Sequence, residues 1–316
     1  MNTLQMSPLT DSFIETFNSI PFEKILDHPN ILIAARFWDD ERYDSAKTCY
    51  KFMRAIDDLI DNHKSDHVFI SDEEKGLFKA EVEKWINSFS CTPDEHPLQK
   101  ELIDTVHKFQ IPLWPMEVFA KSMIYDIHND GFPTMQSFLE YSEGATVAPA
   151  SIFVHLCSLK EEDGQYIEPA FDLKEVSTPC AVFSYLVHII RDFEKDQCNN
   201  LNYFADDLVE KYGLNREALR KIALGGNIPL GFRELIREYY LLADVYRKKT
   251  WEVLDRIAPL LEPRYRLSLE IIFNLYLMVF ERIDVDNGTF SALELTPTPD
   301  EIKARVYKTI LNFQTV

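Results

Sequence analysis

The sequence predicts an all-α fold, a single-domain bundle of helices around a central cavity. Only nine of its 316 residues are glycine, and alternating apolar runs that would indicate β-strands are few. Prolines fall mainly between segments in which apolar residues recur with helical spacing. No linker rich in glycine, serine or proline divides the chain, and no repeat with a period of about 34 to 45 residues occurs. We therefore expect residues 1–316 to form one helical domain.

Capping signals mark where several of the helices begin. Ser71 followed by Glu74 is a capping box, and Thr298 followed by Glu301 is another. Asn215 is a further N-cap residue, and the helix that it opens ends at two consecutive glycines. The expected helices lie at about residues 31–63, 73–89, 98–109, 115–129, 134–158, 173–197, 204–212, 216–224, 232–258 and 263–283, with a last helix that ends near Phe313.

Charge and cysteine usage restrict the class of partner and the compartment. With 33 Lys and Arg against 52 Asp and Glu, the net charge of −19 disfavours nucleic acid as an electrostatic partner. The five cysteines are dispersed, which is typical of reduced thiols in the cytoplasm. Glu270 and Asn274 interrupt the longest apolar stretch, which is too short to span a bilayer. We expect a cytoplasmic protein that contacts the inner face of the membrane at most transiently and peripherally, and the oligomeric state stays open.

Two acidic clusters within strongly apolar helical segments are the most informative feature. Asp-x-x-x-Asp pairs occur four times, at 40/44, 57/61, 126/130 and 192/196. The 40/44 pair lies among other charged residues, as on a solvated face, and the 126/130 pair precedes a glycine, as at a helix end. The other two pairs lie on helices that would otherwise belong to the core, where unpaired carboxylates are costly. If these two pairs face each other, they could hold a hard divalent metal that binds substrate phosphates. The candidate residues are Asp57, Asp61, Asp192 and Asp196.

Basic and aromatic residues accompany both acidic pairs. Arg54 precedes the first pair and Arg191 adjoins the second, so each could neutralise a carboxylate, grip diphosphate oxygens, or do both. His188 lies one turn before Asp192 and could face the same cavity, although a histidine among apolar residues is more often part of the core. Together these residues indicate diphosphate chemistry in a helical cavity.

In these motifs the chain resembles the squalene/phytoene synthase family, the head-to-head all-trans prenyl transferases. The resemblance covers roughly residues 25–290 and implies a bundle of the isoprenoid-synthase type. Asp126 matches an acid on a preceding helix, and three tyrosines match family positions outside the two motifs. The residues that carry the resemblance are the first motif, Tyr50-x-x-x-Arg54-x-x-Asp57-Asp58-x-x-Asp61, the second, Arg191-Asp192-x-x-x-Asp196, and the separate tyrosines Tyr141, Tyr203 and Tyr276.

The resemblance implies a reaction and assigns roles in it. Mg²⁺ held by Asp57, Asp58, Asp61, Asp192 and Asp196 would bind the diphosphates of two farnesyl or geranylgeranyl chains. Condensation would pass through a cyclopropyl diphosphate to a hydrocarbon of the squalene or phytoene type, and Tyr203, Tyr50 or the leaving diphosphate would take the released proton. NADPH is compatible with this scheme as a reductant, but its use stays open. The implied substrate-binding residues are Arg54, Arg191, Tyr141, His188, Tyr185 and Tyr276.

Several positions depart from the family pattern. Tyr185 and His188 stand where the family usually has Gln and Asn, and Met53 stands where it has Cys. Leu201 replaces the family's Arg two residues before Tyr203. Several groups that contact the diphosphate in the family therefore differ here, which leaves substrate length and product open.

Two other functions compete with this one. The run from Asp57 to Asp61 also matches the DDxxD motif of terpene cyclases and chain-elongating prenyl transferases, although the segment from Arg191 to Asp196 fits neither class well. A non-catalytic helical protein that binds a partner through its acidic faces is the alternative from a different class. It would tolerate Asp57→Asn and would leave the apolar flanks of both acidic pairs unexplained.

Overall fold

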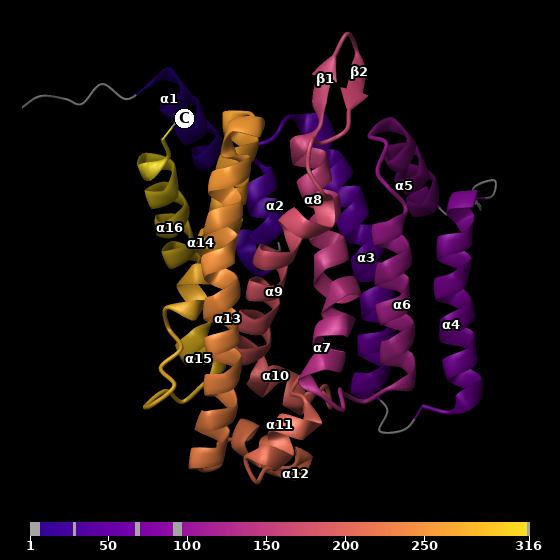
Figure 1. The fold of residues 1–316 in the computed structure, drawn as a ribbon, viewed down its shortest axis with the longest axis vertical. Coiled ribbons are helices and arrows are strands. Elements are labelled where there is room, and N and C mark those ends of the chain that lie inside the picture. Colours follow the sequence, from indigo (N-terminus) through magenta and orange to yellow (C-terminus); the bar gives the residue numbers. More distant parts are fainter. Residues whose placement is uncertain (1–6, 28–29, 67–69, 91–96, 315–316) are drawn as a thin grey trace, which may run out of the picture.

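The all-α prediction is confirmed by the computed structural model, which describes residues 7–27, 30–66, 70–90 and 97–314. Long helices pack side by side along one direction (Figure 1). The short helices α10 (Phe193–Cys198), α11 (Asp206–Lys211) and α12 (Arg216–Ala223) lie together at one end of the bundle (Figure 1). At the opposite end, β1 (Lys160–Glu162) and β2 (Gln165–Ile167) form an antiparallel hairpin in which Glu161 faces Tyr166.

The first half of the chain builds one side of the bundle. The long α3 packs against α5, α6 and α8. Helix α7 continues through a π-helical turn, η3, into α8. The elements are α1 (Pro8–Ser19), the 3₁₀ helix η1 (Phe22–Asp27), α2 (Asn30–Ala35), α3 (Asp40–Asp66), α4 (Asp72–Asn87), the 3₁₀ helix η2 (Ser88–Ser90), α5 (Pro97–Lys108), α6 (Trp114–His128), α7 (Met135–Ser142), η3 (Glu143–Val147) and α8 (Ala148–Ser158).

The second half supplies the other side. Helix α9 packs mainly against α13, and α14 packs against α16 and α2. The elements are α9 (Leu173–Arg191), α10 (Phe193–Cys198), α11 (Asp206–Lys211), α12 (Arg216–Ala223), α13 (Leu230–Ile257), the 3₁₀ helix η4 (Ala258–Leu260), α14 (Pro263–Phe280), α15 (Ala292–Leu295) and α16 (Pro299–Asn312).

The capping signals act as the sequence predicts. The Ser71 hydroxyl accepts the backbone N–H of Glu74, whose carboxylate accepts the N–H of Ser71 in return. Thr298 and Glu301 form the same reciprocal pair at α16. Asn215 accepts the N–H of Ala218 and opens α12. These bonds satisfy backbone donors that a helix start otherwise leaves without partners.

Some predicted boundaries are wrong. The helix expected at 31–63 is two helices, because the chain turns after Ala35 and Asp39 accepts the N–H of Arg42 to open α3. The helix expected at 173–197 breaks at Asp192, whose φ and ψ are −92° and 6°. The sequence reading also missed α1, α15 and the hairpin. The hairpin had a signal, since Asp163-Gly164 provides the two left-handed residues that a tight turn requires.

The apolar core divides into three groups. The largest fills the space among α3, α6, α8, α9 and α13 and includes the fully buried Phe52, Phe183 and Tyr239. A second group joins α1, α14 and α16. The third is small and lies where Val154 and Ile257 meet, toward the hairpin end. The main core encloses the cavity described below.

The π-helical turn η3 packs tightly on α6 because residue 144 is glycine. A Cβ atom on Gly144 would collide with the Ser122 hydroxyl and the Val118 carbonyl oxygen. We expect Gly144→Ala to lower the free energy of unfolding by about 1–3 kcal/mol, since backbone would have to move. Urea unfolding measures this change. Gly76→Ala is the matched control, because no described atom lies within 4 Å of its Cβ and alanine should stabilise α4 by about 1 kcal/mol. Equal effects of the two substitutions would contradict this account of the turn.

Candidate active site

A cavity of about 320 Å³ lies among α3, α8, α9, α13, α14 and the π-helical turn. One end is polar and carries Tyr50, Arg54, Asp57, His188 and Tyr276. The π-helical turn contributes Ala145 and Thr146 to the wall, so this irregular segment shapes the site. The rest of the wall is mainly apolar and includes Ile31, Met53, Phe119, Ala150, Phe153, Val176, Ala181, Val253, Leu254, Ile257 and Leu269. The cavity therefore suits a long apolar group that bears a polar head.

The first acidic cluster lies on α3 at the polar end. Arg54 Nη1 donates to Asp57 Oδ2 at 2.7 Å, and Arg54 Nη2 pairs with Asp58. Burial, opposed by Arg54, raises the pKa of Asp57 to about 6. Burial and the neighbouring carboxylates of Asp57 and Asp126 raise the pKa of Asp61 to about 8. The predicted spacing thus brings the carboxyl groups of Asp57, Asp58 and Asp61 together, and the single charge of Arg54 compensates only part of their negative charge.

The second acidic cluster lies where α9 gives way to α10. Arg191 donates to both oxygens of Asp192, from Nε at 2.6 Å and from Nη2 at 3.0 Å, and His188 Nε2 lies 2.6 Å from Oδ2. Burial alone would raise the pKa of Asp192, but the hydrogen bonds from His188 and Arg191 outweigh it and the pKa is lowered. Asp196 has no comparable partner, and burial together with the charge of Asp192 raises its pKa to about 7.

Two half-buried tyrosines, Tyr185 and Tyr203, connect the two clusters. The pKa of Tyr203 is raised well above its usual value by burial and then by Asp61 from one cluster and Asp196 from the other. The pKa of Tyr185 rises for the same reasons. The Tyr185 and Tyr203 rings lie 6.1 Å apart. Carboxylates of both clusters therefore act on the same phenols.

A buried lysine that the sequence reading missed completes this region. Lys64 Nζ lies 3.3 Å from Asp126 Oδ1 and donates to the carbonyl oxygen of Asn129 at 2.9 Å. The Tyr141 hydroxyl donates a hydrogen bond to Asp126 Oδ2 at 2.5 Å. Asp126 is thus held between a cation and a phenol close to the first cluster. The signal for Lys64 was its position three residues after Asp61, which puts both on one helix face.

The remaining predicted residues line the polar end. Burial raises the pKa values of Tyr50 and Tyr276, and Arg191 opposes the rise at Tyr276. Met53, which replaces a family cysteine, also lines the cavity. Within the described part of the chain, no three Asp, Glu, His or Cys side chains converge closely enough to hold a metal ion by themselves. The carboxylates instead form two groups, one on α3 and one where α9 gives way to α10.

An all-α bundle with one acidic cluster at the polar end of an apolar cavity, and a second one joined to that end through His188, defines the class of helical enzymes that act on long apolar substrates with anionic heads. The chain belongs to the squalene/phytoene synthase family, whose model matches residues 28–301. As a member of this family it is a prenyltransferase, and the family supports head-to-head isoprenoid condensation in general, with isoprenoid diphosphates as substrates.

Solved structures share the fold. A dehydrosqualene synthase in complex with ligand is 14% identical, with a TM-score of 0.66 and coverage of 96% of this chain and 98% of that chain. The squalene synthase HpnC from Alicyclobacillus acidocaldarius is 16% identical, with a TM-score of 0.61 over 82% and 93% of the two chains. YisP from Bacillus subtilis subsp. subtilis strain 168 is 11% identical, with a TM-score of 0.56 over 96% and 99%. A search of curated proteins found no match. None of the helices described is both long and apolar enough to cross a membrane.

Proposed function

We propose that the protein catalyses the Mg²⁺-dependent head-to-head condensation of two farnesyl or two geranylgeranyl diphosphates. The reaction would proceed through a cyclopropyl diphosphate to a hydrocarbon of the squalene or phytoene type. The observation that carries the proposal is that two acidic clusters act on the same tyrosine beside one largely apolar cavity. Neither feature alone would select this chemistry from the other activities that an acidic helical protein can have.

The carboxylates fit a magnesium site that is completed by substrate. Burial and nearby carboxylates raise the pKa values of Asp57, Asp61 and Asp196 even though Arg54 pairs with Asp57, so the cations present compensate these carboxylates only in part. Mg²⁺ is usually bound by one or two protein carboxylates and keeps water and substrate phosphate oxygens as its other ligands. Bound there, Mg²⁺ would act as a Lewis acid that stabilises charge on the departing diphosphate.

The arginines would orient the diphosphate groups. Arg54 pairs with Asp57 and Asp58 and lines the polar end of the cavity, and Arg191 pairs with Asp192, which also bonds to His188 in that lining. A guanidinium fork binds phosphate oxygens bidentately, and its charge stabilises the leaving group as the C–O bond breaks. The apolar wall would exclude water, which would otherwise capture the allylic cation.

Tyr203 and Tyr50 are better suited to donate hydrogen bonds than to accept the proton that is released during condensation. The pKa values of Tyr203 and Tyr50 are both raised by burial, so both remain neutral phenols near pH 7. A neutral phenol is a weak base. The leaving diphosphate is therefore the better acceptor for the proton that is lost when the cyclopropane ring closes, and Tyr203 would donate a hydrogen bond.

Turnover with defined substrates tests the proposal. We expect purified protein with Mg²⁺ to convert farnesyl or geranylgeranyl diphosphate into a doubled-chain hydrocarbon or a cyclopropyl diphosphate, identified by mass spectrometry of extracted lipid. Parallel reactions with and without NADPH reveal whether the final cation is reduced. Asp57→Ala and Asp192→Ala should each abolish the product, whereas Asp44→Ala, on an exposed part of α3, should not. A cyclic terpene from a single chain would assign a cyclase, and absence of any product would reject the proposed reaction.

A further inference from the structure

A second cavity, of about 480 Å³, opens beside the active site at the α10–α12 end of the bundle. Unlike the apolar cavity, it has a wall rich in basic and amide side chains. The cations come from separate parts of the chain, which the fold brings together. They are Lys64 at the end of α3, Lys75 on α4, and Arg216 and Arg220 on α12.

The charge at this cavity is opposite to that of the whole protein. Its four cations share the lining with two carboxylates, Asp130 and Glu217, in a chain with a net charge of −19, and Lys64 and Arg216 also pair with carboxylates outside the lining. Glu217 already pairs with Lys221 at 2.8 Å, outside the lining. Among the described residues, Lys75 and Arg220 form no ion pair with a carboxylate, and their positive charge can attract an anion.

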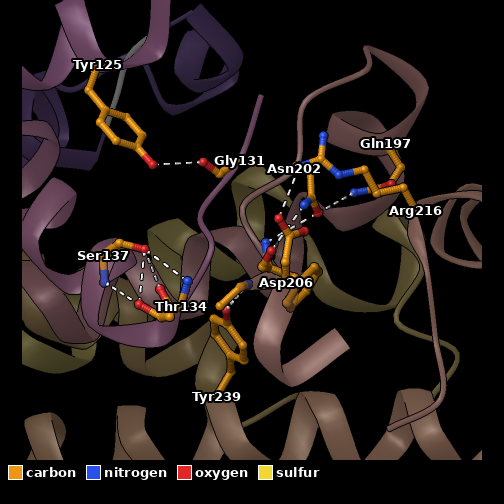
Figure 2. Close-up of polar contacts among 11 residues, drawn as sticks. Tyr125, Gly131, Thr134, Ser137, Gln197, Asn202, Asp206, Arg216 and Tyr239 are labelled. Atoms are coloured by element: carbon orange, nitrogen blue, oxygen red, sulfur yellow. Dashed lines mark hydrogen bonds and ion pairs between the residues drawn. The ribbon is translucent and has the colours of Figure 1, made fainter. Parts of the chain in front are cut away.

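Amide groups order the chain segment beside Arg216. The Gln197 side chain is only 6% exposed, and its Nε2 donates to the Leu201 carbonyl oxygen at 3.2 Å and to Asn202 Oδ1 at 3.3 Å. Arg216 extends from α12 toward Asn202 and Asp206 (Figure 2), and its Nη2 lies 3.4 Å from Asp206 Oδ2. It also covers residue 131, where a Cβ atom would lie 2.7 Å from Arg216 Nη2.

Arg220 has a neutral partner. Its Nη1 donates to Asn200 Oδ1 at 3.1 Å, so an amide occupies the position that a carboxylate would usually take beside a guanidinium. An amide orients the guanidinium but leaves its charge uncompensated. The remaining N–H groups can therefore form charge-assisted hydrogen bonds to phosphate oxygens.

The basic cavity adjoins the catalytic region at two points. Lys64 lines it and also pairs with Asp126, next to the first acidic cluster. Gln197 directly follows Asp196, and the Leu201 N–H donates to the Asp196 carbonyl oxygen at 2.9 Å. Leu201, which stands where the family has an arginine, is part of the lining. Cations from α3, α4 and α12 thus surround the position from which that arginine is missing.

We propose that this basic cavity binds a phosphate or diphosphate group next to the active site. The proposal deepens and rests on the proposed function, because that reaction releases diphosphate beside Asp196. Two sources share this chemistry, namely the released diphosphate and the phosphates of a nicotinamide nucleotide. In either case Arg216 and Arg220 contact the phosphate oxygens. The hydrogen bonds of Gln197 and Asn202 stabilise the adjoining wall of the cavity.

Metal-free binding separates this cavity from the metal site. With EDTA present, the two acidic clusters repel inorganic pyrophosphate, so calorimetric binding reports the basic cavity. We expect the unmodified protein to bind pyrophosphate and the double variant Arg216→Gln/Arg220→Gln to bind it roughly tenfold more weakly. The matched control is Arg256→Gln/Arg264→Gln, which removes the same charge from exposed positions at the opposite end of the bundle.

Competition between pyrophosphate and nicotinamide nucleotides identifies the source of the phosphate group that the cavity binds. Displacement of pyrophosphate by NADPH but not by NADH would assign the cavity to the nucleotide's 2′-phosphate, and resistance to both would assign it to released diphosphate. Equal affinity in the unmodified protein and the Arg216/Arg220 variant, or equal loss in the Arg256/Arg264 control, would overturn the proposal. These measurements do not depend on turnover, so a failure of the proposed condensation would be seen separately, in the product assay.

Discussion

Asp61→Asn is expected to remove activity and, at pH 8, to make the protein more resistant to heat. The pKa of Asp61 is raised from its usual value of 3.8 to about 8 in the folded state, chiefly by burial. The unfolded chain therefore ionises first as pH rises, and folded stability is lost progressively between about pH 4 and pH 8. A neutral amide has no such penalty. We expect the substitution to add on the order of 2 kcal/mol at pH 8, or a few degrees in melting temperature.

The same substitution should lower condensation by roughly 10²-fold to 10³-fold, because it removes a group placed to act on the diphosphate. Thermal unfolding at pH 5 and pH 8 in EDTA, with the product assay alongside, measures both effects. The gain in melting temperature should be larger at pH 8 than at pH 5. Asp44→Asn is the control, since its carboxylate is exposed and its pair with Lys47 should contribute little. An Asp61→Asn protein that melts at or below the temperature of the unmodified protein at pH 8 would contradict the assignment.

Local sequence rules predicted the elements that carry the first acidic cluster. Helical spacing and apolar flanks placed Asp57 and Asp61 on one helix, and the capping pairs at α4 and α16 formed as expected. These features depend on residues within one or two turns of each other, so a single sequence contains the information. The family was likewise recognisable, because its motifs are short and their order is fixed along the chain.

Contacts between distant segments could not be predicted in the same way. Lys64 and Asp126 are 62 positions apart, and their pairing depends on how α3 meets α6. The break at Asp192 replaces an expected continuous helix, and Arg191 and His188 both bond to the carboxylate there. Such features follow from packing, which overrides local preference and leaves no periodic signal. The cations of the basic cavity belong to this group too, since they come from three separate helices.

Ala181→Trp should block the apolar cavity and separate diphosphate binding from turnover. Ala181 is 4% exposed, lines the cavity, and lies ten residues before Arg191 on α9, or about 15 Å along a helix. An indole there would occupy space that the isoprenoid chain needs, well away from the carboxylates. We expect turnover of farnesyl and geranylgeranyl diphosphates to fall at least about 100-fold, because a misplaced chain cannot reach a reactive geometry. Binding of inorganic pyrophosphate with Mg²⁺ should remain unchanged.

The experiment needs a control for stability, because overpacking the wall of the apolar cavity lowers the free energy of unfolding by about 1–3 kcal/mol. Ala181→Gly is a suitable comparison, since it destabilises a helix by about 1 kcal/mol without filling the cavity. It should retain turnover while Ala181→Trp loses it. The ten-carbon geranyl diphosphate adds a second readout, because a shortened cavity should shift the ratio of kcat/KM values toward the shorter chain. Full turnover of geranylgeranyl diphosphate by Ala181→Trp would show that the isoprenoid lies elsewhere, and loss of pyrophosphate binding in the same variant would show that the cavity and the acidic clusters are not separable.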